Sequence, residues 1–196
     1  PVVVSRLNEF SGKGFRLDHG PLLIKAIKGT EGHRLHGAGE PFSPVVAYHQ
    51  QNSKIYCRGI TVAWQLADCG AGDGGFAIVP GSHKSNFACP ESFAAFEKTG
   101  PWLKHIPQQA GSVVIFTEAL AHSTCPWTNA ENARVAIFNL YNSVGSRWGK
   151  WEPPEELVAQ MPPMRQTLFR GTHCADNVPG FRYHGQNQRN RPRTEA

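Results

Sequence analysis

Two residues that could do chemistry, His122 and Arg134, stand at corresponding ends of two short apolar runs. The run Val113–Phe116 leads to His122, and Arg134 opens the run 135–138. A further histidine, His49, follows an extended segment earlier in the chain. Two histidines on different strands, joined by a carboxylate, form the set that holds non-haem Fe(II) and leaves coordination positions open. A guanidinium binds a carboxylate through two parallel hydrogen bonds. The order His49, His122, Arg134 therefore favours an iron site beside an anchor for an acidic cosubstrate.

The segments that must position these residues read as short strands separated by turns. Residues 55–67 alternate, with Ile60, Val62 and Trp64 on one predicted face and Thr61, Ala63 and Gln65 on the other. Further strands are expected at 76–80, 113–116 and 133–143, and short helices within 91–104 and 154–161. Residues 1–48 are expected to form strands and loops without a long helix. This spacing is typical of a sandwich or barrel and not of a parallel α/β fold.

Composition limits the classes of protein that this chain can belong to. The 196 residues are 40% hydrophobic, enough for one folded domain, and no apolar run of about 18 residues predicts a membrane span. The five cysteines show no close pair, which favours free thiols in a reducing, cytoplasmic location. Of the net charge of +5, the segment 182–196 carries +3 (four arginines, one glutamate), which disfavours a nucleic-acid-binding body. We expect one domain over 1–181, lacking an N-terminal piece since the chain opens on Pro1, and a polar basic tail over 182–196.

Two segments, 61–86 and 111–141, resemble the phytanoyl-CoA dioxygenase family of Fe(II)/2-oxoglutarate oxygenases. The resemblance covers about residues 49–141 well and the ends of the chain poorly. The matching residues are Gly74-Gly75, Pro80-Gly81-Ser82-His83-Lys84, Gly111, Phe116, His122 and Arg134.

The resemblance implies a mainly β fold, a double-stranded β-helix (jelly roll, cupin-like) with a few short flanking helices. It implies Fe(II) and 2-oxoglutarate as cofactors and the hydroxylation of a small-molecule substrate, while composition and charge already disfavour a nucleic-acid or membrane partner. His122 would be the distal iron ligand, and Arg134 would hold the C5 carboxylate of 2-oxoglutarate. We also expect Thr124 and Trp64 at the 2-oxoglutarate site.

The sequence departs from the family at the first iron-binding motif, which is His-x-Asp. The best-placed candidate is His49-Gln50-Gln51, so His49 and Gln51 become the expected metal ligands, with a neutral amide in place of the carboxylate. Three interpretations stay open: Gln51 is a weak ligand or is misaligned, the carboxylate comes from elsewhere, or iron binding is lost and the chain is a jelly-roll binding protein. Carboxylates that could substitute are Asp18, Glu40, Asp68 and Asp73. We also expect that His36 could face the site and that Glu118 could line its pocket.

Overall fold

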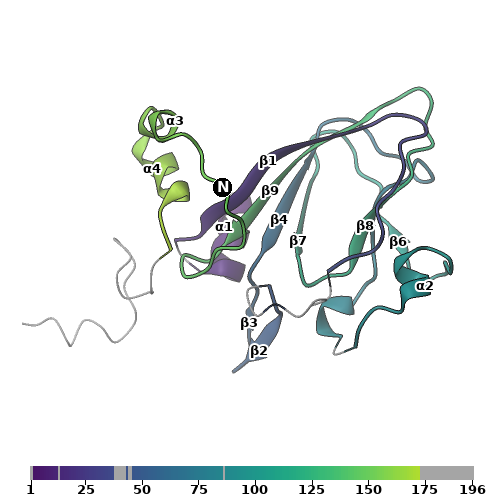
Figure 1. The fold of residues 1–196 in the computed structure, drawn as a ribbon, viewed down its shortest axis with the longest axis horizontal. Helices are drawn as coiled ribbons and strands as arrows, with labels where there is room; N and C mark the ends of the chain where they lie inside the picture. The colour runs from purple at the N-terminus through teal and green to yellow at the C-terminus, as the bar shows by residue number, and fades with distance from the viewer. Residues whose placement is uncertain (1, 13, 38–42, 44–45, 86, 173–196) are drawn as a thin grey trace, which may run out of the picture.

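Two antiparallel sheets face each other in the computed structural model, which describes residues 2–12, 14–37, 43, 46–85 and 87–172. The larger sheet has the order β1 (Arg16–Ala26), β9 (Arg134–Asn142), β4 (Ile60–Gln65), β7 (Val113–Thr117). The smaller sheet has the order β6 (Lys104–His105), β5 (Gly75–Ile78), β8 (His122–Cys125). In Figure 1 the strands of the larger sheet run side by side, with β8 and β6 on the other side of the fold. The expected mainly β, jelly-roll class is confirmed.

The alternation expected in residues 60–65 decides which side chains face the space between the sheets. Ala63 packs there with Phe76 of β5 and Phe116 of β7. Since successive residues of a strand point to opposite faces, Thr61 shares that inner face and Val62 the outer one. Val62 is fully buried on the outer face, in a cluster that includes Leu7.

A helix covers this outer face, and the sequence did not indicate it. Helix α1 (Val2–Ser11) buries Leu7, which is 1% exposed, against the larger sheet. The expectation of no long helix in residues 1–48 is therefore wrong. The run Val2-Val3-Val4 favours a strand by its β-branched side chains, but burying a leucine contributes about 1.5–3 kcal/mol, which outweighs the few tenths of a kcal/mol that propensity costs per residue.

The segment expected as one strand over 55–67 is divided in two. Gly59 has a left-handed φ of 62°, which turns the chain between β3 (Lys54–Tyr56) and β4. Strand β3 pairs instead with β2 (His49–Gln51), and this small hairpin is a sheet of its own. The strands expected at 76–80, 113–116 and 133–143 are confirmed, to within a few residues, as β5, β7 and β9.

The helices are short and lie at the edges of the fold. Helix α2 (Glu91–Ala94) covers only the start of the segment 91–104, whereas α3 (Glu155–Ala159) begins after Pro154 as expected. Helix α4 (Pro163–Gln166) follows it, and Figure 1 places α3 and α4 at the end of the sheet far from α2. The remaining helical turns are η1 (Ser82–Lys84) and η2 (Thr167–Phe169).

A buried ion pair at the start of β1 ties the ends of several elements together. Nη1 of Arg16 donates to Oδ1 of Asp18 at 2.7 Å, and both side chains are at most 5% exposed. Oδ2 of Asp18 accepts from Nδ2 of Asn142 at 2.5 Å and from the backbone N–H of Trp148 at 2.7 Å. Oδ1 of Asn142 in turn accepts from the N–H of Gly59 at 2.8 Å. This network fixes the ends of β1, β9 and β4 relative to one another.

The basic tail that we expected over 182–196, together with its boundary, lies outside the described residues. Within the described part of the chain, every helix is too short or too polar to span a bilayer.

Cys57, Cys69 and Cys125 are buried free thiols, and their burial raises the pKa of each thiol.

Candidate active site between the two sheets

A cavity of about 320 Å³ opens between the sheets, and His122 is among the residues that line it. Its apolar wall comes from both sheets, with Phe116 of β7 and Phe138 of β9 opposite Phe76 of β5. Its polar lining residues are His19, His33, His36, Thr61, Glu118, His122, Ser123 and Thr124. A mostly apolar cavity with a few converging polar groups has the usual character of a small-molecule site.

His122 begins β8, and a second histidine lies directly beside it. The backbone N–H of His36 donates to the carbonyl of His122 at 3.1 Å, and the N–H of His122 donates back to the carbonyl of His36 at 2.9 Å. This bridge brings the two imidazole rings to a centroid separation of 4.3 Å. The structure therefore pairs His122 with His36, which the sequence had offered only as a residue that could face the site.

Hydrogen bonds from both imidazoles prepare them as ligands. Nδ1 of His122 lies 2.7 Å from the carbonyl oxygen of Leu120, and Nδ1 of His36 lies 3.1 Å from that of Arg34. Since a carbonyl can only accept, each Nδ1 must carry the proton, which leaves the lone pair of a neutral ring on Nε2. This is the usual way in which an outer carbonyl orients a metal-binding histidine. Burial lowers the pKa of His122, although the carboxylate of Glu118 opposes the shift.

Glu118 is the carboxylate of this cavity. It follows β7, and its side chain is 17% exposed. Oε1 accepts a short hydrogen bond from the hydroxyl of Thr61, while Oε2 lies 3.9 Å from Nε2 of His122. As these side chains stand, no group of three or more His, Cys, Asp or Glu residues in the described segments closes around a point where a metal ion could sit.

Arg134 begins β9 and is 1% exposed. Nη1 donates to Oγ1 of Thr124 at 3.2 Å, whereas Nε and Nη2 are buried without a hydrogen-bond partner. No carboxylate in the described part of the chain forms an ion pair with this guanidinium. Burial lowers the pKa of Arg134, but a guanidinium stays charged in a protein. A buried cation with two unpaired donors beside a cavity is well suited to a carboxylate ligand.

The expected ligands His49 and Gln51 lie elsewhere. Both are on β2, where all three residues are exposed, and neither lines the cavity that holds His122. These two residues lie away from the cavity because the backbone groups of residues 49–56 pair with each other in a hairpin. The structure therefore does not bring this pair to His122.

Trp64, expected at the 2-oxoglutarate site, also lies away from the cavity. Its side chain is 36% exposed, on the face of β4 opposite to Thr61. The residue that reaches the cavity from this strand is Thr61. The sequence already indicated that Thr61 and Trp64 cannot both face the cavity, because the alternation of residues 60–65 placed them on opposite faces of the strand.

The substitute carboxylates proposed from sequence are engaged in other contacts. Asp18 belongs to the buried network at the start of β1. Asp68 accepts from the N–H of Ala110, and Asp73 accepts from the N–H of Gly70, each at 2.7 Å. Glu40 lies outside the described residues. None of the three described aspartates lines the cavity.

Gly37 explains how His36 approaches His122. Gly37 has a φ of 96°, and a Cβ there would overlap the carbonyl oxygens of Glu118 and Leu120. Only a glycine allows the chain to pass this close to the turn between β7 and β8. The sequence Leu35-His36-Gly37 therefore held a signal for a close approach, although not for the partner.

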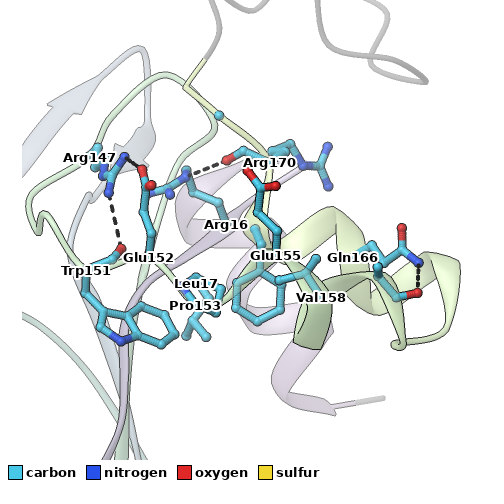
Figure 2. Close-up of a pocket in the computed structure, with 13 residues that line it drawn as sticks. Arg16, Leu17, Arg147, Trp151, Glu152, Pro153, Glu155, Val158, Gln166 and Arg170 are labelled. Carbon is cyan, nitrogen blue, oxygen red and sulfur yellow. Dashed lines mark hydrogen bonds and ion pairs between the residues drawn. The ribbon is translucent and has the colours of Figure 1, made fainter.

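A second cavity, of about 410 Å³, lies where α3 and the segment after α4 meet the start of β1 (Figure 2). Its arginines already have protein partners. Arg147 donates to Oε1 of Glu152 at 2.6 Å and to the carbonyl of Trp151 at 3.2 Å, as the dashed lines of Figure 2 show. Arg16 donates to the carbonyl of Arg170 at 3.1 Å. Unlike Arg134, none of these lining residues has a buried polar atom without a partner.

Comparison with solved structures identifies the same fold in other proteins. HygX from Streptomyces hygroscopicus, with nickel, 2-oxoglutarate and hygromycin B bound, is 22% identical with a TM-score of 0.62, over 72% of this chain and 61% of that chain. The iron-bound form of HygX gives 22% identity and a TM-score of 0.60, over 72% of this chain and 63% of that one. EvdMO1 is 18% identical with a TM-score of 0.53, over 73% of this chain and 31% of that one. At such identities the likeness establishes the fold.

The chain spans about 61% of the length of HygX. A comparison with curated proteins gives no match. The sequence profile described as "Phytanoyl-CoA dioxygenase (PhyH)" matches residues 17–136, a span that contains His36, His122 and Arg134. The resemblance drawn from the two sequence segments is thereby confirmed, and with it the expected cofactors of the family, Fe(II) and 2-oxoglutarate. This chain belongs to the phytanoyl-CoA dioxygenase family.

Proposed function

We propose that this protein is an Fe(II)/2-oxoglutarate-dependent oxygenase that hydroxylates a small molecule. The observation that carries the proposal is the state of Arg134. Its guanidinium is 1% exposed, two of its N–H groups have no partner, and Thr124 joins it to the cavity that holds His122. An unsatisfied buried donor costs about 1–3 kcal/mol, so the protein maintains this arrangement at a cost that a bound carboxylate would offset.

The residues in and beside the cavity would have different roles in this reaction. Arg134 and Thr124 would hold the C5 carboxylate of 2-oxoglutarate, and His122 and His36 would hold the metal through their Nε2 atoms. The metal and its cosubstrate would supply the oxidising power that an unactivated C–H bond requires. The phenyl rings of Phe76, Phe116 and Phe138 would exclude water and pack against the apolar part of a substrate.

The fold comparison supports a small molecule as the substrate. HygX, which shares this fold, has been crystallised with 2-oxoglutarate and hygromycin B. A cavity of about 320 Å³ has the size of a small-molecule site and not of a polymer-binding groove. The buried free thiols Cys57, Cys69 and Cys125 support the cytoplasmic location expected from the sequence.

The decisive experiment is an anaerobic titration of Fe(II) and 2-oxoglutarate, followed by succinate formation after oxygen is admitted. The wild-type protein is expected to give a visible absorbance band that needs both additions, and to form succinate. His122→Ala should lose the band, and Gln51→Ala, on the exposed hairpin, should keep it. A His122→Ala protein that still holds iron and turns over 2-oxoglutarate would overturn the assignment.

The second candidate is a jelly-roll binding protein without redox activity. Two observations favour it: neither His36 nor His49 is followed two positions later by a carboxylate, since Ala38 and Gln51 stand there, and the described residues hold no closed group of three metal ligands. Such a protein would stay folded and give neither the absorbance band nor succinate under the same conditions.

A further inference from the structure

We propose that Glu118 supplies the carboxylate ligand of the metal, in place of the aspartate that is missing after His49. The metal set would then be His36, Glu118 and His122, two imidazoles and one carboxylate. In the sequence the carboxylate would precede the distal histidine by four positions within one turn, instead of following a proximal histidine by two. The inference rests on the proposed function.

Glu118 lies in the same cavity as the two proposed histidine ligands. It is the only carboxylate among the described residues that line this cavity. Nδ1 of His122 is committed to the carbonyl of Leu120, so in the neutral ring the lone pair of Nε2 faces Oε2 of Glu118. Oε2 of Glu118 and Nε2 of His122 lie 3.9 Å apart, so one cation placed between them could bind both the carboxylate and the imidazole.

The distance that must close is small. With metal–ligand bonds of about 2.0–2.2 Å, two ligands at right angles lie about 3 Å apart. Oε2 of Glu118 and Nε2 of His122 are 3.9 Å apart, so they need to approach by roughly 1 Å. The backbone of Glu118 is anchored by its N–H, which donates to the carbonyl of Gly59 at 2.8 Å. Rotation of the side chain alone can supply the movement, because glutamate has three rotatable bonds.

Thr61 supplies the partner that a ligating carboxylate usually has. Its hydroxyl donates to Oε1 and leaves Oε2 free for the metal. Outer hydrogen bonds of this kind orient the ligand atoms in known metal sites. By contrast, both oxygens of Asp18 are already occupied by protein donors.

The test measures metal binding and needs no substrate. Co(II) is titrated anaerobically into the wild-type protein and Glu118→Gln, with calorimetry for affinity and the visible Co(II) spectrum for coordination. Glutamine has nearly the same shape, and its Oε1 can still accept from Thr61, so the unliganded protein should melt at an unchanged temperature. Mutating a residue that only hydrogen-bonds to a metal ligand costs about 10- to 100-fold in metal affinity. Loss of the ligand itself should therefore weaken Co(II) binding by about 100-fold or more and alter the spectrum.

Matched variants separate this inference from the proposed function. Glu91→Gln removes an exposed carboxylate outside the cavity and should leave Co(II) affinity and spectrum unchanged. Glu118→Asp keeps the charge on a shorter side chain and should recover part of the affinity. If Glu118→Gln binds Co(II) as the wild type does while His122→Ala does not, the assignment of Glu118 is wrong and the proposed function stands. If the wild-type protein binds no Co(II), both are wrong, and if Gln51→Ala abolishes binding, the hairpin supplies the ligand instead.

Discussion

Replacing Arg134 by methionine should separate cosubstrate binding from folding. The substitution removes two buried N–H groups that have no partner, each costing about 1–3 kcal/mol. It also removes the hydrogen bond to Thr124 and the contact of the guanidinium with the ring of Phe138, 5.9 Å away, together worth about 2–4 kcal/mol. Methionine keeps most of the aliphatic volume. The gains and losses nearly cancel, so the unliganded variant should unfold within about 2 kcal/mol of the wild type.

The same substitution should weaken binding of 2-oxoglutarate strongly. Losing one partner of a buried charge pair costs about 2–5 kcal/mol, which is about 30-fold or more in Kd. In the wild type with Mn(II) present, 2-oxoglutarate at 100 times its Kd adds about 2.7 kcal/mol, or roughly 5–10 °C in Tm for a chain of this size. With Kd raised 30-fold or more, the same concentration adds at most about 0.9 kcal/mol, so Arg134→Met should show no more than about a third of this shift.

Thermal melts with and without 2-oxoglutarate measure both effects, and Arg6→Met is the control, since that guanidinium is exposed on α1. A structural arginine behaves differently, because breaking a satisfied buried ion pair costs about 3–5 kcal/mol. If Arg134→Met loses that much stability without ligand, or still gains the full shift with 2-oxoglutarate, the reasoning from its unpaired donors is refuted.

Three further substitutions test the arrangement around the cavity. His49→Ala should leave Co(II) affinity unchanged in calorimetry, because the side chain is exposed on the hairpin; a large loss would restore the sequence-based assignment. Gly74→Ala should lower stability to urea by several kcal/mol, since a Cβ would overlap the carbonyl oxygen of Pro126, whereas Gly72→Ala, at a similar φ with open space, should cost about 1 kcal/mol. Asp18→Asn should cost about 3–5 kcal/mol in the same assay, because it leaves a buried guanidinium without its counter-charge; an unchanged midpoint would contradict this.

The parts of the fold that the sequence predicted correctly are those that depend on local pattern. The alternation of residues 60–65 and the apolar runs around Phe116 and Phe138 reflect strands with one face toward a core, and the structure has them as β4, β7 and β9. Helix α1 could not be predicted in this way, because it is stabilised by the contact of Leu7 with β4, a residue pair distant in sequence. Its local residues, three valines in a row, favoured a different structure.

The same distinction between local pattern and contacts distant in sequence applies to the residues of the candidate site. His122 and Arg134 could be chosen as candidates from the sequence because each begins a strand of the core, β8 or β9. His122 lines the cavity, and Arg134 donates to Thr124, which also lines it. The second imidazole of the candidate site could not be predicted, because His36 and His49 both precede β4 at spacings that fit the family's first iron-binding histidine. Spacing to a known motif favoured His49, which follows an extended segment and has a possible ligand two positions later.

What distinguishes the two histidines is the backbone around them, and that evidence was partly present in the sequence. Gly37 follows His36 directly and removes the one side chain that would keep the segment from the carbonyls of Glu118 and Leu120. His49 is followed by Gln50 and Gln51, whose backbones pair with β3 in the hairpin. A glycine next to a candidate ligand indicates that the backbone comes close to something there, and in this chain it comes close to the turn that carries both Glu118 and His122. With the ligand set that we propose, the missing carboxylate after His49 and the close approach at Gly37 have one physical explanation: the ligands would assemble around the turn between β7 and β8, without the hairpin of β2.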